Sequence, residues 1–89
     1  MYYVYILRTS SNTLYTGQTN NLKRRLSEHK NKSGKSAKYI RYFSFFNLVC
    51  FEKYKTRKEA VQREIQIKKL TKVKKEDLIT KGLEILKKI

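Results

Sequence analysis

Two stretches near the N-terminus decide the fold: YYVYILR at residues 2–8 and LYTGQ at residues 14–18. Both are dense in β-branched and aromatic residues, which fit the pleated surface of a sheet. The residues between them are threonine, serine and asparagine, which are the types that form turns. The sequence therefore predicts a β-hairpin at the start of the chain.

A short helix is expected after the hairpin. Asn20 and Asn21 are good N-cap residues for it. The segment LKRRLSEHK at residues 22–30 places Leu22 and Leu26 four residues apart, on one face. This pattern predicts a short amphipathic helix.

A basic segment and a third strand follow. Residues 30–38, KNKSGKSAK, are small, polar and basic, which indicates a surface loop. Residues 39–43, YIRYF, fit either a further helical turn or an irregular segment. Residues 45–54, FFNLVCFEKY, are dense in β-formers and predict a third strand, which we expect to be central in the sheet.

Two helices are predicted in the C-terminal part. Thr56 and Glu59 have the spacing of a capping box, so we expect a helix that runs from there through residue 70. The apolar stripe of this helix comprises Ala60, Val61, Ile65 and Ile67. A last, basic amphipathic helix is expected over residues 74–88.

The expected order is β-β-α-loop-β-α-α, without an internal repeat or a linker. This order predicts an α+β fold, in which helices flank a small, mainly antiparallel, three-stranded sheet. The 89 residues have room for one domain, residues 1–89, with a single modest core.

The charge balance points to a polyanionic partner. Lysine and arginine total 22 and aspartate and glutamate total 7, a formal net charge of +15. Such an excess favours binding to DNA, RNA or an anionic membrane surface. The hydrophobic fraction of 39% is too high for a disordered basic tail.

The inventory of reactive side chains excludes several classes of enzyme. One cysteine, one histidine and one aspartate are too few for an intramolecular disulfide, a zinc site or paired-aspartate two-metal chemistry. The three glycines lie too far apart for a loop that cradles phosphates. No signal peptide or membrane-spanning stretch is recognisable, so we expect a cytoplasmic protein.

One carboxylate falls on the apolar face of a predicted helix. Ala60, Glu64 and Ile67 lie at i, i+4 and i+7, which turns Glu64 toward the core. An ionised carboxylate there needs a cation, several donors or a metal. On periodicity alone, an ordinary ion pair with Lys68 or Arg63 is favoured.

Four further side chains are candidates for chemistry. Arg25 and His29 are neighbours on the first predicted helix, where a guanidinium suits phosphate contact and a histidine suits proton transfer. A basic solvated face with one incidental histidine is the alternative. Tyr5 and Tyr15 lie on the two strands of the hairpin. Close by, Gly17 would let a phosphate approach the backbone or would form a bulge.

Taken in order, these positions resemble the GIY-YIG nuclease family. The two signature elements appear as VYI at residues 4–6 and YTG at residues 15–17. Arg25 follows the second element by eight residues and His29 follows Arg25 by four, as the family's arginine and its histidine or tyrosine do. Glu64 lies just ahead of an Ile-Lys pair, like the family's metal-binding glutamate.

The resemblance covers about residues 2–79 and is strongest to the short, stand-alone bacterial members. It implies the GIY-YIG endonuclease fold as a single domain, with the basic helix over residues 74–88 at its end. It also implies hydrolysis of phosphodiester bonds in DNA with one Mg²⁺ or Mn²⁺ ion.

The resemblance assigns a role to each candidate. Glu64 would hold the metal, and Arg25 would donate to the scissile phosphate. Tyr5 or Tyr15 would deprotonate or orient the attacking water, with His29 assisting. A tyrosine base needs a pKa below its usual value near 10, which we expect Arg25 and the metal to supply.

The expected partner is nucleic acid, DNA rather than RNA, with no membrane partner and no small-molecule cofactor. We expect sequence-independent contacts and structure-selective cutting in repair or recombination. The candidate nucleic-acid-binding residues are Gly17, Lys23, Arg24, Lys30, Lys32, Lys35, Lys38 and Lys68. A non-catalytic nucleic-acid-binding module on the same fold is the main alternative, and a basic partner of a ribosome, nucleoid or anionic membrane is a third.

Overall fold

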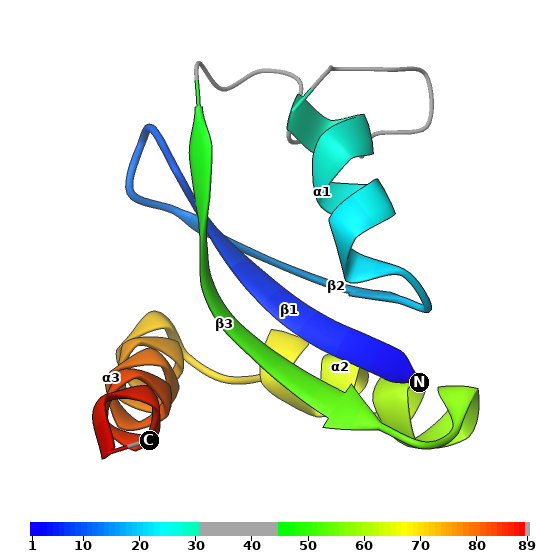
Figure 1. Ribbon diagram of the computed structural model, residues 1–89. Helices are drawn as coiled ribbons and strands as arrows, with labels where there is room; N and C mark the ends of the chain where they lie inside the picture. The colour runs from blue at the N-terminus through cyan, green and yellow to red at the C-terminus, as the bar shows by residue number, and fades with distance from the viewer. Residues whose placement is uncertain (31–44, 89) are drawn as a thin grey trace.

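The computed structural model describes residues 1–30 and 45–88, with the side chains of those up to residue 82 (Figure 1). The elements are β1 (Tyr2–Thr9), β2 (Leu14–Thr19), α1 (Leu22–Lys30), β3 (Phe46–Tyr54), α2 (Arg57–Lys68) and α3 (Lys72–Lys88). The loop predicted over residues 30–38 lies outside the described residues except for Lys30, which ends α1. The segment 39–43 lies outside them as well.

The sheet has the order β2-β1-β3, with both pairs antiparallel, as the sequence predicts for this α+β fold. The expectation that β3 is the central strand is wrong, because β1 holds that position. The four residues Val4–Leu7 of β1 are at most 1% exposed, whereas every residue of β3 is exposed or half-buried. β3 lies at an edge because the hairpin leaves one side of β1 open to it, and its charged side chains remain in contact with water.

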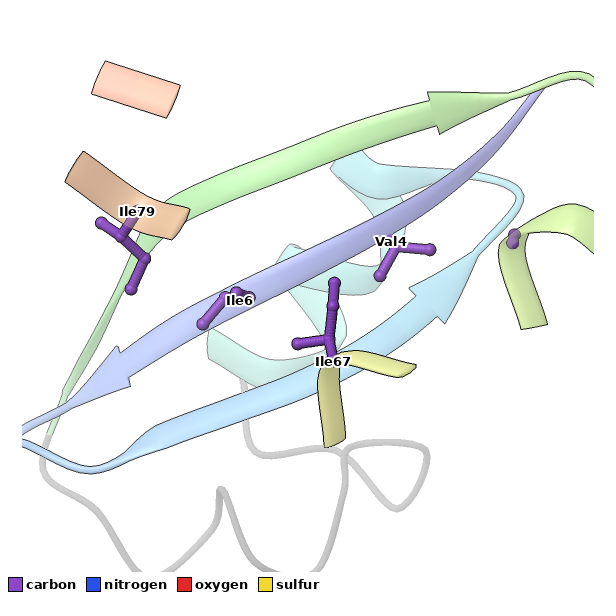
Figure 2. Close-up of a cluster of buried hydrophobic side chains, with 5 residues drawn as sticks. Val4, Ile6, Ile67 and Ile79 are labelled. Carbon is purple, nitrogen blue, oxygen red and sulfur yellow. The ribbon is translucent and has the colours of Figure 1, made fainter. Parts of the chain in front are cut away.

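Two hydrophobic layers cover the two faces of the sheet. α2 and α3 lie on one side of it and α1 on the other (Figure 1). The first core contains Val4 and Ile6 of β1 together with Ala60, Ile67 and Ile79 from the two helices (Figure 2). Along β1, Val4 and Ile6 alternate with Tyr5 and Leu7, whose side chains face α1.

The second core is smaller and lies under α1. Tyr5 and Leu7 form its buried centre. The partly buried side chains around them are Tyr15, Leu22, Leu26 and Phe46. Because a tyrosine and a histidine occupy much of this layer, the α1 side of the sheet combines packing with polar chemistry.

The hairpin turn is built by the threonine and asparagine predicted to form it. Asn12 has a φ of 61°, in the left-handed region that asparagine tolerates. The Thr9 hydroxyl accepts hydrogen bonds from the backbone N–H groups of Ser11 and Thr13. These bonds satisfy backbone donors that the strands cannot reach, so the turn is specified locally.

Both predicted N-caps are present. The Asn21 side chain accepts the Arg24 N–H at 3.0 Å, and the Thr56 hydroxyl accepts the Glu59 N–H at 3.2 Å. Glu59 does not complete the reciprocal bond of a capping box in this structure, because its carboxylate instead accepts the Thr56 hydroxyl at 2.9 Å. α2 ends at Lys68, two residues earlier than expected. The buried stripe of this helix is narrower than the predicted apolar stripe, because Ile65 is 47% exposed.

Polar contacts attach α3 to the hairpin. The Arg8 guanidinium forms a two-pronged ion pair with the Glu76 carboxylate. The Lys72 ammonium donates to the Asn12 carbonyl at 2.7 Å. These contacts fix the register of α3 at the end of the sheet where the hairpin turns.

In the described chain, no helix is long and apolar enough to cross a membrane.

Thr16 carries a buried hydroxyl that has no hydrogen-bond partner within the described residues. Thr16→Val should therefore raise the free energy of unfolding by about 1 kcal/mol, because it removes the cost of an unsatisfied polar atom. Urea denaturation measures this difference. Thr19→Val is the matched control and should destabilise, since the Thr19 hydroxyl accepts the Asn21 N–H at 3.1 Å. Equal destabilisation by both variants would contradict the conclusion that the Thr16 hydroxyl is an unsatisfied polar atom.

Candidate active site

Tyr5 lies at the centre of the site, over a glycine of the neighbouring strand. Tyr5 pairs with Gly17 in the register of β1 and β2. A Cβ built on Gly17 would lie 2.5 Å from the Tyr5 hydroxyl oxygen and 2.7 Å from the ring carbon that bears it. Only a residue without a side chain leaves room for the tyrosine ring at this point.

The Tyr5 hydroxyl is hydrogen-bonded to His29 of α1, with 3.0 Å between Oη and Nε2. His29 is 1% exposed. Tyr15 of β2 and Phe46 of β3 meet the imidazole at ring-centre distances of 5.8 and 6.0 Å, in both cases edge to face. The aromatic rings therefore hold the imidazole in one orientation toward Tyr5.

Arg25 lies one helical turn before His29, with its side chain 23% exposed. Its guanidinium lies 3.4 Å from a carboxylate oxygen of Glu28. Burial opposes the charge of Arg25, but hydrogen bonds with Tyr5 and Glu28 raise its pKa above the usual value. Arg25 is therefore a permanent cation beside the Tyr5 hydroxyl.

Glu64 lies on α2, in the opposite layer. Its side chain is 19% exposed, and its carboxylate lies 3.6 Å from the Lys68 ammonium. The negative charge of Glu64 contributes to raising the pKa of Tyr5, which places the two groups within electrostatic reach. The ion pair with Lys68 favoured from periodicity is present, and the charge of Glu64 acts on Tyr5 as well.

Arg25 lowers the pKa of Tyr5, which is the direction expected of it, but burial outweighs this contribution. Burial raises the pKa of Tyr5 to about 12, the charges of Tyr15 and Glu64 add to the rise, and the hydrogen bond from Arg25 only offsets part of it. The pKa of His29 falls to about 4, through burial first and then through the charge of Arg25. Both groups of the hydrogen-bonded pair are therefore uncharged at neutral pH.

The donor set around Glu64 fits a hydrated hard cation. The described residues contain no group of three or more histidine, cysteine, aspartate or glutamate side chains that could enclose a metal ion. A single, partly exposed carboxylate is an oxygen ligand that leaves most coordination positions to water. Mg²⁺ prefers this arrangement because it retains several waters when it binds to proteins.

The candidate nucleic-acid-binding residues are distributed unevenly. Lys23, Arg24 and Lys30 are exposed on α1, and Lys68 is exposed on α2. Lys32, Lys35 and Lys38 lie outside the described residues. The Tyr5 ring fills the side of Gly17 on which a Cβ would project, and the approach of a phosphate to this backbone stays a prediction.

Sequence reasoning missed two features of the α1 side. Phe46 packs against His29, and Tyr3, Phe51 and Lys53 line a groove beside the site. Alternation along the strands was the available signal, since Tyr3 and Tyr5 share a face of β1. Which side chains of β3 lie on that face depends on a register shift opposite Ile6 and Leu7, and the sequence does not reveal this shift.

Comparison with known proteins gives consistent matches. Residues 1–77 match the family model of the GIY-YIG catalytic domain. A UPF0213 protein from Clostridium perfringens is 48% identical over 80 residues, which cover 90% of this chain and 84% of the relative. A UPF0213 protein from Natronomonas pharaonis is 44% identical over 78 residues, with 88% of this chain and 89% of the relative covered.

A solved structure matches as well. The solution NMR structure of a UPF0213 protein from Bacillus halodurans superposes with a TM-score of 0.60 and 39% sequence identity. The match covers 92% of this chain and 87% of the other. The sheet and the three helices thus correspond to an experimentally determined fold.

Gly17→Ala should displace Tyr5 and lower the free energy of unfolding by about 2 kcal/mol, because its Cβ would collide with the buried ring. Gly82→Ala is the matched control. Among the described side chains, a Cβ there meets only the Cys50 sulfur at 3.8 Å, and alanine favours the helix. Urea denaturation measures both variants. A Gly17→Ala protein as stable as the Gly82→Ala protein would contradict the close approach of Tyr5.

His29 should make the protein less stable in mild acid. Its pKa is about 4 when folded and about 6.5 when unfolded, so the unfolded state binds more protons between these values. The stability contributed by the neutral imidazole is complete above pH 6.5, and about 2 kcal/mol of it is lost by pH 5. Denaturation midpoints at pH 7.5, 6 and 5 measure this loss. His29→Phe should flatten the profile over this range, and an unchanged slope in that variant would assign the loss to other groups.

Proposed function

Since the chain belongs to the GIY-YIG family of nucleases, we propose that it is a metal-dependent endonuclease that hydrolyses phosphodiester bonds in DNA. The observation that carries this proposal is the convergence of three groups on one hydroxyl. Arg25 and His29 of α1 are hydrogen-bonded to Tyr5, and the charge of Glu64 acts on it from α2. A purely structural tyrosine does not need a cation, a neutral acceptor and a carboxylate around it.

Arg25 is proposed to bind the scissile phosphate. Its pKa is raised, so it keeps its charge at any physiological pH. A guanidinium can donate two parallel hydrogen bonds to phosphate oxygens, and these bonds strengthen as negative charge builds up in the transition state. Its contacts with Tyr5 and Glu28 orient it before the substrate arrives.

Tyr5 and His29 are proposed to transfer a proton together. Because the pKa of Tyr5 is about 12, a tyrosinate base is disfavoured. The Tyr5 hydroxyl can instead accept a proton from the attacking water while it donates its own to the neutral Nε2 of His29. Tyr5 stays uncharged throughout, and the proton taken from water ends on the imidazole.

Glu64 is proposed to hold the divalent cation. Once bound, Mg²⁺ or Mn²⁺ would withdraw charge from the scissile phosphate and the leaving oxygen. The role of Glu64 is to supply an oxygen ligand beside Tyr5. The nearby Lys68 ammonium limits the negative charge at the carboxylate until substrate and metal arrive.

The exposed cations on α1 are proposed to bind the DNA backbone on either side of the cut. Lysine and arginine side chains such as Lys23, Arg24 and Lys30 can bind phosphates without recognising the base sequence. Cutting would then be selected by the shape of the DNA. Branched, flapped or nicked DNA of this kind arises in repair and recombination, where we propose that the protein acts.

A cleavage assay tests the proposal on duplex, single-stranded, flapped and branched DNA, and on RNA, with Mg²⁺ or Mn²⁺. EDTA should abolish cutting, and Glu64→Gln should reduce it to below about one hundredth because the carboxylate ligand is lost. Salt-sensitive binding of DNA should persist in this variant. Asp77→Asn is the matched control, since it removes one negative charge from the exposed surface of α3 and should leave cleavage unchanged.

The same assay tests the proton transfer. Tyr5→Phe keeps the ring over Gly17 but removes the hydroxyl, so cleavage should fall by about 10²–10⁴-fold. Wild-type rates in the Glu64→Gln or Tyr5→Phe protein would remove that residue from the mechanism. Tight binding without cleavage of any substrate by the wild-type protein would instead support the non-catalytic binding module.

A further inference from the structure

An open groove of about 610 Å³ lies on the α1 side of the sheet, beside the candidate active site. Tyr3 of β1 and Phe51 of β3 line it from the sheet, and Leu26 lines it from α1. Two exposed lysines also line the groove. They are Lys23 of α1 and Lys53 of β3. The groove thus combines an aromatic lining with positive charge on both sides.

The aromatic rings of the groove are accessible. Phe51 is 40% exposed, although burial would contribute favourably to folding. The centroids of Tyr3 and Phe51 are 6.4 Å apart, with their planes inclined by 56°. Two inclined rings of this kind offer apolar faces on which a flat ligand can stack.

The groove lies next to the site, because its lining residues neighbour Tyr5. Tyr3 and Tyr5 point to the same face of β1 and are two residues apart, about 7 Å along the strand. Phe51 is the β3 partner of Tyr5 in the register. Leu26, which packs against Tyr5, also lines the groove. A strand of DNA whose phosphate contacts Arg25 would therefore have its next nucleotides within reach of the groove.

We propose that this groove binds an unpaired nucleotide of the DNA strand that flanks the cut. The base would stack on Phe51 and Tyr3, and Lys23 and Lys53 would bind the adjacent phosphates. The proposal rests on the proposed function and gives it a substrate class, which is DNA with a single-stranded flank, such as a flap or fork.

The positive charge of the groove and its aromatic lining both favour an unpaired nucleotide as the ligand. Within a duplex, both faces of a base are covered by its neighbours, so only an unpaired base can present a face to Phe51. A second copy of this chain is a poor occupant, since each copy carries a net charge of +15 and the groove is flanked by lysines. A polyanion with accessible bases satisfies both the charge and the aromatic lining.

Binding without cleavage tests the groove. Fluorescence anisotropy in EDTA, on a Glu64→Gln background, measures the affinity for a single-stranded, a forked and a blunt duplex DNA. Phe51→Ala should weaken binding to the first two by roughly 10-fold or more and to the blunt duplex by less than about 3-fold. Leu48→Ala is the matched control, because Leu48 is an apolar side chain of β3 with 36% exposure that does not line the groove.

Two further variants separate stacking from charge. Lys53→Ala should weaken binding to the single-stranded and forked DNAs and lower the salt dependence of that binding by about one phosphate contact. Phe51→Trp introduces a fluorophore into a chain that has no tryptophan, and oligo-dT should quench its emission when a base stacks on it.

The outcomes distinguish the groove from the catalytic proposal, since the binding assay contains no metal and no active enzyme. Equal effects of Phe51→Ala and Leu48→Ala, or the same loss for the forked and the blunt DNA, would overturn the groove whatever the cleavage assay shows. Tighter binding of a single-stranded RNA, lost in Phe51→Ala, would overturn the assignment to DNA. A Phe51-dependent preference for unpaired DNA supports the groove even if no cleavage is found.

Discussion

The contact of the Tyr5 ring with Gly17 is the constraint on which the rest of the site depends. Because Gly17 has no side chain, the ring can lie over the edge strand, and its hydroxyl reaches His29 at 3.0 Å. This one hydroxyl thereby links the hairpin to α1. The charge of Glu64 on α2 also acts on it, so residues of both helical layers influence this one hydroxyl.

Burial then determines the chemistry that this atom can perform. A buried tyrosine and a buried histidine are each most stable uncharged, and the two hydrogen-bond each other in that state. The charged groups, Arg25 and Glu64, keep partial exposure and have partners of opposite charge. The site thus separates the groups proposed to shift protons, which are buried, from those proposed to bind phosphate and metal, which water can reach.

Ion pairs distribute the charge of the whole molecule. Most acidic residues of the described chain are paired with lysine or arginine, as in Arg8 with Glu76 and Arg63 with Glu52. Partly exposed pairs contribute little to stability, but they leave few free carboxylates to repel a polyanion. The remaining cations are therefore available to a polyanion such as the proposed DNA substrate. The groove beside the site adds aromatic contacts to this charge, which backbone binding alone does not provide.

The amino-acid sequence by itself determined the hairpin, the capped starts of α1 and α2, the α+β class and the spacing of the candidate residues. Local propensity and periodicity encode these features, because each depends on residues close together in the chain. Only the tertiary structure decided that β1 is the central strand, that Phe51 lies beside Tyr3, and that the charge of Glu64 acts on Tyr5. It also decided that the pKa of Tyr5 rises rather than falls. These features depend on strand register and burial, which arise from contacts between residues far apart in the chain.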